Sequence, residues 1–234
     1  AMRAGRALEP KRTIIVAGHG FEAVSAVALA EDPEVEIVRQ EAQLGTGHAV
    51  DQARAALDDF DGTVIVLYGD CPLIQPRTLE ELSATLSTAA VSVLGFEAKN
   101  PARYGRLITD GDRLKRIVEF KDANPAERAV RLCNSGVMAA SAQLLFDLLS
   151  EIDANNASGE LYLTDVIGKA VGRGLSCTAV RCAERETLGV NSRVELMQAE
   201  KEFQTLRRAE ALEDGISMPV PETVHFSYDT VIGR

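Results

Sequence analysis

The sequence has 234 residues, and its 35 Asp and Glu against 25 Lys and Arg give a formal net charge of −10 at pH 7. This acidity argues against broad binding to a nucleic acid backbone, although a few donors and a metal ion can still hold one nucleotide in a pocket. A hydrophobic share of 46% is typical of a protein with a buried core. No apolar run approaches the ~20 residues of a membrane span.

Strands and helices are predicted to alternate through the first third of the chain. Short apolar, β-branched runs that indicate buried strands occupy residues 13–17, 36–38 and 63–67, with helices expected over 21–30 and from after Ala49 through Leu57. The third run ends at Gly69-Asp70 and is predicted to be a central strand, buried on both faces as in a parallel sheet. Asp70 at its carboxyl end can hold a metal ion, although a carboxylate here also suits a helix cap or a turn.

The remainder of the chain adds a hairpin and further helices. Thr78 is predicted to cap a helix over 78–86, with Glu81 in the capping-box position. The turn residues Asp110-Gly111-Asp112 indicate an antiparallel hairpin within 104–119, so the sheet should be mixed. Further strands are expected at 90–95, 132–140 and 177–180, and further helices at 142–152, 163–171 and after Asn191. This alternation predicts an α/β domain of three layers.

Cysteine and histidine are sparse. The four cysteines, at 71, 133, 177 and 182, form no C-x-x-C pair, and the three histidines are scattered. Neither a zinc site nor a disulfide framework is expected. Buried free thiols in a reducing compartment are the simpler interpretation, and a cytoplasmic protein is predicted.

Seven segments read QEAQLGTGHAV, LYGDCPLI, YGRLI, IVEFKDA, CNSGVMAA, SGELYLTDVI and GVNSRVEL. In this order and spacing they resemble the bifunctional bacterial family of N-acetylglucosamine-1-phosphate uridyltransferase/glucosamine-1-phosphate acetyltransferase. The resemblance covers the chain from about Val16 onward. It implies an α/β, Rossmann-like nucleotide-diphospho-sugar transferase fold with a mixed, mostly parallel sheet and helices on both faces.

The resemblance also implies a reaction. Members of this family join UTP and N-acetylglucosamine 1-phosphate into UDP-N-acetylglucosamine and pyrophosphate with Mg²⁺, for peptidoglycan and lipopolysaccharide precursors. An oxygen of the sugar phosphate attacks the α-phosphorus of UTP directly, so no serine, cysteine or general base is required. Positioning and charge neutralisation then account for catalysis. Nucleic acid and membrane partners are not expected.

The metal positions are carried over from the matched motifs. Asp70 corresponds to the family's catalytic metal aspartate, and Asn191 corresponds to its partner ligand. Because Mg²⁺ favours oxygen ligands, one carboxylate and one amide oxygen are a plausible protein share, and both side chains are expected to face one crevice. Asn191 also suits the N-cap of the following helix, a role that Ser192 could take instead.

The nucleotide is implied to contact five residues. Gln40, Gly45 and Thr46 match the uridine-binding segment, and Tyr68 and Gly69 belong to the same wall as Asp70. Gln40 offers a donor and an acceptor together, which suits the edge of uracil. Gly45 permits close approach of the backbone to a flat base, and Thr46 adds a hydroxyl. On the residues alone, Gln40 and Thr46 could equally be loop caps.

The amino sugar and its phosphate are implied to contact Gly105, Glu119 and Asn134. Glu119 accepts hydrogen bonds only, which suits sugar hydroxyls, and Asn134 can both donate and accept. A glutamate in a hairpin is more simply a solvated strand residue. Asn134 lies inside an apolar strand, where a buried amide needs partners.

Both ends of the chain depart from the family pattern. Nothing in residues 1–12 matches the glycine-rich loop, with its arginine and lysine, that opens the family. We therefore expect residues 1–215 to be an N-terminally incomplete uridyltransferase domain. Residues 216–234 are expected to be a linker and the first edge of a truncated left-handed β-helix, through which the full-length protein would form a homotrimer. The alternatives are a related transferase of other base or sugar specificity and an inactive fragment.

Overall fold

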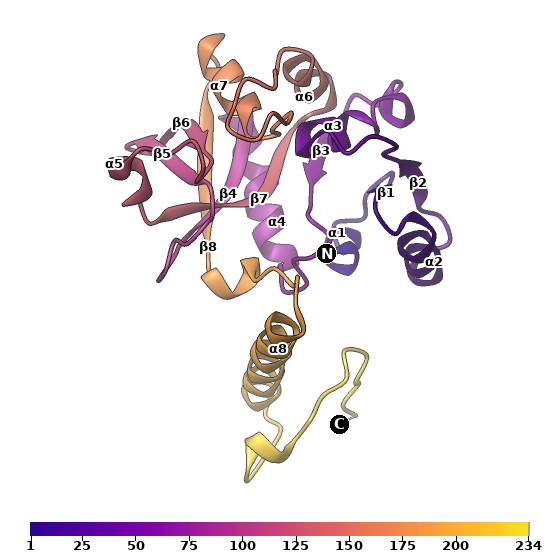
Figure 1. The fold of residues 1–234 in the computed structure, drawn as a ribbon. Coiled ribbons are helices and arrows are strands. Elements are labelled where there is room, and N and C mark those ends of the chain that lie inside the picture. The colour runs from indigo at the N-terminus through magenta and orange to yellow at the C-terminus, as the bar shows by residue number, and fades with distance from the viewer. Residues whose placement is uncertain (234) are drawn as a thin grey trace.

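The computed structural model describes residues 1–233, and Figure 1 shows a mixed α/β body from which a long helix and a tail extend. Its larger sheet has the strand order β3-β7-β4-β8-β6-β5, and β1 and β2 form a separate pair. The strands are β1 (Ile14–Ala17), β2 (Glu36–Arg39), β3 (Thr63–Val66), β4 (Val91–Glu97), β5 (Arg106–Asp110), β6 (Arg113–Val118), β7 (Leu132–Ser141) and β8 (Cys177–Cys182).

Most of the longer helices lie where the sequence predicts them, with shifted ends, whereas the short helix α5 (Pro125–Arg128) is not predicted. The helices are α1 (Met2–Arg6), α2 (Phe21–Glu31), α3 (Thr46–Asp51), α4 (Pro76–Ala84), α5 (Pro125–Arg128), α6 (Ala142–Leu149), α7 (Asp165–Gly172) and α8 (Arg193–Glu213). Short 3₁₀ turns are η1 (Ala55–Leu57), η2 (Thr85–Ser87), η3 (Glu184–Thr187) and η4 (Pro221–Thr223). None of the helices in residues 1–233 combines the length and the apolar character that crossing a bilayer requires.

Helices cover both faces of the larger sheet (Figure 1). On one face, Val93 of β4 and Met138 of β7 belong to the same apolar cluster as Leu145 of α6. On the other face, Leu94 of β4 packs in a cluster with Leu82 of α4. Neighbouring residues of one strand point to opposite faces, so a strand that is apolar throughout needs a helix layer on each side. The predicted three-layer α/β fold is confirmed.

The mixed character of the sheet is also confirmed, but the balance of strand directions differs from the expectation. The pairs β1–β2 and β4–β8 are parallel. The pairs of β7 with β3, β4 and β5, and of β6 with β5 and β8, are antiparallel. Antiparallel pairs therefore predominate among those described, because β7 runs against its neighbours and β5–β6 is a hairpin.

The prediction that residues 63–67 form a central strand, buried on both faces, is wrong. Strand β3 lies at one edge of the larger sheet and pairs with β7. Thr63 is exposed, and the other residues of the strand are half-buried. Val64 and Ile65 nevertheless pack against different apolar clusters. An edge strand covered on both faces thus produces the same apolar run as a central strand.

The start of α4 is stabilised differently from the predicted capping box. Its N-cap is Gln75, which makes no side-chain capping bond, and Thr78 lies inside the helix. The carboxylate of Glu186, in η3, instead accepts a hydrogen bond from Thr78 Oγ1 at 2.6 Å and one from the Gln75 amide at 3.3 Å. Glu186 is only 4% exposed. A negative charge at a helix N-terminus is favourable, so a distant residue takes the place of the local cap.

The tail after α8 folds back onto that helix. The side chain of Gln204 accepts a hydrogen bond from the Phe226 amide at 2.8 Å and donates one to the Phe226 carbonyl at 2.7 Å. Phe226 is buried. The last residue of the expected β-helix edge, Arg234, lies outside the described residues.

The role of Glu186 can be tested by its removal. Glu186→Ala leaves the buried hydroxyl of Thr78 and the Gln75 amide without their acceptor, and we expect the free energy of unfolding to fall by about 1–3 kcal/mol. Urea denaturation followed by circular dichroism measures this change. Glu81→Ala, at the exposed position of the predicted capping box, is the matched control and should change stability by less than about 0.5 kcal/mol. Equal losses in the two variants would contradict the assignment.

Candidate active site

The loop after β3 meets the loop before α8 beyond the carboxyl end of β3. The amide of Val190 donates a hydrogen bond to the carbonyl oxygen of Asp70 at 2.9 Å. Gly189 lies beside both of the predicted metal ligands: a Cβ built on it would stand 3.4 Å from Asp70 Oδ2 and 3.5 Å from Asn191 Nδ2. The structure therefore brings Asp70 and Asn191 together, although they are far apart in sequence.

The helix cap next to Asn191 is provided by its neighbour. Ser192 is the N-cap of α8, and its Oγ accepts a hydrogen bond from the Glu195 amide at 3.2 Å. Asn191 contributes its backbone amide, which donates to Glu195 Oε2 at 2.8 Å. Of the two capping residues that the sequence allows, Ser192 takes the role. The side-chain amide of Asn191 is therefore free for another function beside Asp70.

Cys71 connects the Asp70 loop to η3. Its Sγ lies 3.6 Å from Asp70 Oδ1 and 3.9 Å from the carbonyl oxygen of Thr187. Burial, together with the nearby Asp70 carboxylate, raises the pKa of Cys71 to about 12. The thiol is therefore protonated and neutral at pH 7, and it can donate a hydrogen bond to Asp70 but cannot act as a thiolate nucleophile.

The predicted uridine segment is bound to the loop that precedes α7. Leu161 donates from its amide to the Leu44 carbonyl, and its own carbonyl accepts from the Gly47 amide, both at 2.8 Å. Gly45 has a φ of 118°, and a Cβ on it would stand 2.6 Å from the Leu161 carbonyl oxygen. The protein's own backbone therefore requires glycine at this position, and the close approach of a flat base is not needed to explain it.

Gln40 is held inside this segment by its amide nitrogen. Nε2 donates to the carbonyl oxygen of Gly45 at 3.2 Å and lies 2.9 Å from Nδ1 of His48. From the sequence, Gln40 is expected to offer both a donor and an acceptor to the base. In the structure, the donor side is already engaged by the protein, so the carbonyl oxygen Oε1 is the part of the amide that can bind a ligand.

Tyr68 connects the uridine segment to β7. Its ring lies against Gly136, where a Cβ would stand 2.5 Å from Tyr68 Cε2. Burial of Tyr68 raises its pKa to about 12, with smaller contributions from the carboxylates of Glu119 and Asp70, while a hydrogen bond with Thr46 acts in the opposite direction. Tyr68 is therefore neutral at pH 7 and lies between the predicted sugar, metal and nucleotide residues.

Thr46 and Gly69 are both exposed. The Oγ1 of Thr46 accepts a hydrogen bond from the Leu163 amide at 3.0 Å. Around Gly69 there is open space, since a Cβ on this residue would meet no atom within 4 Å. The absence of a side chain at Gly69 leaves room for a ligand next to Asp70.

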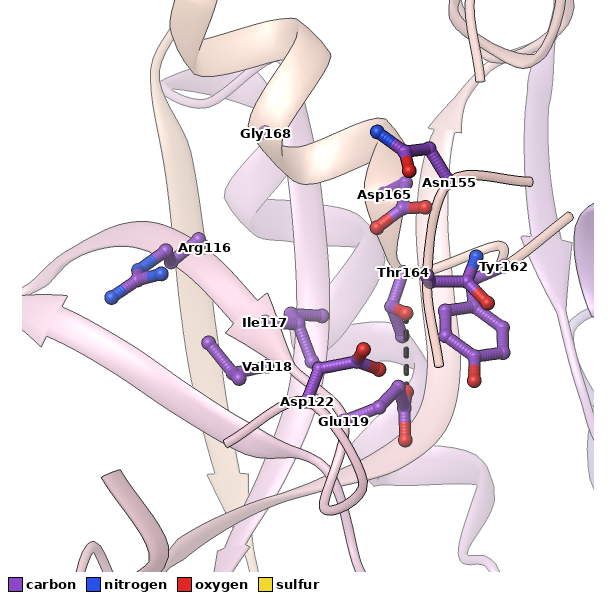
Figure 2. Close-up of a pocket in the computed structure, with 11 residues that line it drawn as sticks. Arg116, Ile117, Val118, Glu119, Asp122, Asn155, Tyr162, Thr164, Asp165 and Gly168 are labelled. Carbon is purple, nitrogen blue, oxygen red and sulfur yellow. Dashed lines mark hydrogen bonds between the residues drawn. The ribbon is translucent and has the colours of Figure 1, made fainter. Parts of the chain in front are cut away.

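The three predicted sugar residues lie together where β5, β6 and β7 meet. The Asn134 amide donates to the Gly105 carbonyl at 2.9 Å. A Cβ on Gly105 would stand 3.2 Å from Glu119 Oε1, and that same oxygen accepts a hydrogen bond from Thr164 Oγ1 at 3.1 Å (Figure 2). Asn134 Oδ1 accepts from the Gly136 amide at 3.1 Å, which leaves the side-chain NH₂ of Asn134 for a ligand.

A cavity of about 340 Å³ lies beside Glu119. Figure 2 shows the side chains of Asp122, Tyr162, Thr164 and Asp165 around it. Burial raises the pKa of Glu119, and the carboxylates of Asp165 and Asp122 add to this increase, while the bond from Thr164 lowers the pKa. Burial likewise raises the pKa of Asp165. The cavity is therefore an acceptor-rich pocket in which ionisation of Glu119 and of Asp165 is disfavoured.

Two residues that line this pocket, Tyr162 and Thr164, are not among the predicted site residues. Both lie in the segment SGELYLTDVI, one of the segments that carry the family resemblance. The two residues are separated by one position, and both side chains line the same pocket. A threonine directly before α7 is also typical of an ordinary helix start. The contact of Thr164 with Glu119 could be recognised only once β6 and α7 were placed together.

Comparison with known proteins identifies the family of most of the chain. A family model described as nucleotidyl transferase matches residues 10–183. A protein of Ruegeria pomeroyi named bifunctional protein GlmU is 59% identical over 234 residues, which are 100% of this chain and 52% of that protein. The chain thus spans about half the length of the curated relatives that it matches.

Solved structures with low sequence identity share the fold. A nucleoside-diphosphate-sugar pyrophosphorylase from Vibrio cholerae has a TM-score of 0.62 at 12% identity, covering 85% of this chain and 84% of its own. A UDP-glucose pyrophosphorylase complexed with UDP-glucose has a TM-score of 0.63 at 17% identity, covering 88% and 86% of the two chains. These similarities confirm the predicted nucleotide-diphospho-sugar transferase fold.

The raised pKa of Glu119 predicts a dependence of stability on pH. A carboxyl group whose pKa is raised by folding holds its proton more tightly in the folded protein, so its ionisation at pH 7 lowers stability. We therefore expect Glu119→Gln to raise the midpoint of thermal unfolding at pH 7, and this gain should shrink as the pH falls towards the ordinary carboxyl range. Glu97→Gln, on an exposed residue of β4, should show no such trend. A lower midpoint for Glu119→Gln at pH 7 would contradict the prediction.

Proposed function

We propose that this chain, which belongs to the nucleotidyl transferase family, transfers a uridylyl group from UTP to N-acetylglucosamine 1-phosphate. The products would be UDP-N-acetylglucosamine, a precursor of peptidoglycan and lipopolysaccharide, and pyrophosphate. The observation that carries the proposal is the meeting of Asp70 and Asn191 beside Gly189, next to the segment that contains Tyr68 and Gly69. The motif resemblance supplies the identity of the nucleotide and of the sugar.

The proposed chemistry is a direct displacement at phosphorus. A phosphate oxygen of the sugar 1-phosphate forms a bond to the α-phosphorus of UTP, while the bond from this phosphorus to the bridging oxygen of pyrophosphate breaks. The attacking oxygen already carries negative charge near pH 7, so no proton has to be removed. The neutral thiol of Cys71 and the neutral hydroxyl of Tyr68 fit a mechanism without a protein nucleophile. Positioning and charge neutralisation are the remaining tasks of the protein.

Asp70 and Asn191 fit the requirements of a magnesium site. Mg²⁺ takes oxygen ligands, is commonly bound by one or two protein carboxylates plus substrate phosphates, and retains several waters. Residues 1–233 contain no group of three or more His, Cys, Asp or Glu side chains that could hold a metal alone. A site of one carboxylate and one amide therefore depends on the substrate for further ligands. Bound Mg²⁺ would neutralise negative charge on the phosphates, and Cys71 would orient the Asp70 carboxylate through its thiol.

The sugar would bind between Glu119, Asn134 and the backbone of Gly105. Thr164 occupies one lone pair of Glu119 Oε1, so the carboxylate retains acceptor capacity for sugar hydroxyls. Asn134, whose Oδ1 already accepts from Gly136, would act as a donor. The cavity of about 340 Å³ next to Glu119 offers space for a substituent of the ring.

The proposal also covers the domain organisation and the cellular location of the protein. Residues 1–215 would form the transferase unit, and residues 216–234 a linker and the first edge of a β-helix through which the full-length protein forms a homotrimer. The end of α8 at Glu213 supports this boundary. The four cysteines in the described part of the chain are free thiols, which supports a reducing, cytoplasmic setting.

A related transferase of other base or sugar specificity would keep the same fold. A substrate screen distinguishes this alternative from the proposed function. It uses UTP, dTTP and CTP, each combined with N-acetylglucosamine 1-phosphate or glucose 1-phosphate. Release of pyrophosphate measures turnover. Preference for UTP with the N-acetylated sugar supports the proposal. Preference for another pair of substrates contradicts it and identifies the alternative specificity.

Asp70→Asn should abolish turnover while the protein stays folded. The substitution removes the negative charge that a divalent cation requires and keeps the shape of the side chain. Pyrophosphate release from UTP and N-acetylglucosamine 1-phosphate with Mg²⁺ measures the effect, and circular dichroism checks the fold. The control is Asp61→Asn, an exposed carboxylate before the same strand, which should keep full activity. Retained turnover in Asp70→Asn would exclude this residue from the metal site.

Gln40→Ala should weaken the use of UTP and leave the fold intact. The loss of one hydrogen-bonding group to the base typically costs about 1–3 kcal/mol, which corresponds to a reduction of kcat/KM by about 5-fold to 150-fold. Initial rates at several UTP concentrations give this value. If the preference among UTP, dTTP and CTP is unchanged in the variant, Gln40 does not contact the base.

A further inference from the structure

The orientation of the Gln40 amide is determined by a backbone carbonyl. The carbonyl oxygen of Gly45 can only accept hydrogen bonds, so the atom that faces it at 3.2 Å must be the NH₂ group of Gln40. A reversed amide would place two oxygens against each other. This contact accounts for one of the two N–H groups of Gln40.

The second N–H group faces His48. Gln40 Nε2 lies 2.9 Å from His48 Nδ1, a normal hydrogen-bond length. Because the amide nitrogen can only donate, Nδ1 must be the accepting nitrogen of a neutral imidazole, and the ring proton must be on Nε2. Both N–H groups of Gln40 are then engaged, and Oε1 is the atom left for a ligand.

The other ring nitrogen of His48 faces a weaker contact. Gln52 Nε2 lies 3.3 Å from His48 Nε2 and donates to the His48 carbonyl oxygen at 3.2 Å. A neutral imidazole has one accepting nitrogen, so it cannot accept from both amides. Gln52 already donates to the His48 carbonyl oxygen, so its approach to the ring Nε2 does not have to be a hydrogen bond, and the contact of Gln40 with Nδ1 is the shorter one. Nδ1 is therefore assigned as the acceptor.

We propose that His48 is a positioning residue that locks Gln40 with its carbonyl towards the base, and thereby makes the site select uracil over cytosine. This inference rests on the proposed function. Uracil presents an N–H donor at ring position 3, whereas cytosine presents a lone pair at the same position. An oxygen that is fixed in front of this position attracts uracil and repels cytosine. Without His48 the amide retains one restraint, at Gly45, and can turn its NH₂ towards cytosine more easily.

The test compares binding of UTP and CTP by calorimetry, with Mg²⁺ present, so that it does not depend on turnover. His48→Phe keeps a ring of similar shape and removes the acceptor, and we expect the UTP-to-CTP affinity ratio to fall by about 3-fold to 10-fold, the effect of one neutral hydrogen bond. His48→Asn retains an acceptor at the δ position and should restore most of the ratio. Gln52→Ala removes the contact at the other ring nitrogen and should leave the ratio unchanged. Thermal unfolding verifies that each variant is folded.

The outcomes are distinguishable from failure of the proposed function. If Gln40→Ala changes the ratio but His48→Phe does not, the role of His48 is excluded while base reading by Gln40 stands. Equal losses in His48→Phe and His48→Asn also overturn the proposal, because they indicate a role in packing. If no variant changes the ratio, including Gln40→Ala, base reading by this segment itself fails.

A measurement on the unaltered protein gives the answer even if a variant does not fold. Nitrogen-15 NMR of the imidazole side chains distinguishes a protonated from an unprotonated ring nitrogen. We expect His48 to be the neutral tautomer with its proton on Nε2. A proton on Nδ1 would place two donors against each other at 2.9 Å and would overturn the assignment.

Discussion

The hydrogen bond from the Val190 amide to the Asp70 carbonyl is the contact on which the candidate active site depends, because it joins two loops that are far apart in sequence. It is a backbone bond, so it holds the two loops together whatever their side chains do. Glu186, in η3 shortly before Val190, stabilises the start of α4, the helix that follows the Asp70 loop. Asp70 and Asn191 are exposed, and they are thus positioned by this backbone bond and by the buried contacts of Glu186 nearby.

Charge is the second constraint on this site. The protein carries a formal charge of −10, and the pocket beside Glu119 is lined by Asp122 and Asp165 as well. A triphosphate and a sugar phosphate add further negative charge, and like charges a few ångströms apart in a partly buried site repel strongly. A divalent cation at Asp70 would reduce this repulsion at the proposed meeting point of the phosphates. Elsewhere in the candidate site, hydroxyl and amide donors are available to bind the substrates without adding charge.

Local patterns predicted most of the elements, and the matched motifs predicted which residues would meet. Asp70 and Asn191 could be placed together because both follow strands of one sheet. Three features could not be predicted from the sequence because they depend on tertiary contacts. The edge position of β3 depends on which strands pair with it, and the cap of α4 comes from Glu186, more than a hundred residues away. The engagement of both N–H groups of Gln40 arises from how its loop folds back on α3, which no spacing rule indicates.

The central claim is that Asp70 and Asn191 together hold a divalent cation for uridylyl transfer. The most direct test is a crystal grown with Mn²⁺ and UDP-N-acetylglucosamine, in which the anomalous scattering of manganese locates the ion without reference to activity. The account predicts one strong peak in contact with an oxygen of Asp70, the amide oxygen of Asn191 and the phosphates of the nucleotide sugar. A peak bound elsewhere, or a nucleotide sugar seated with no ion near these two residues, would contradict it.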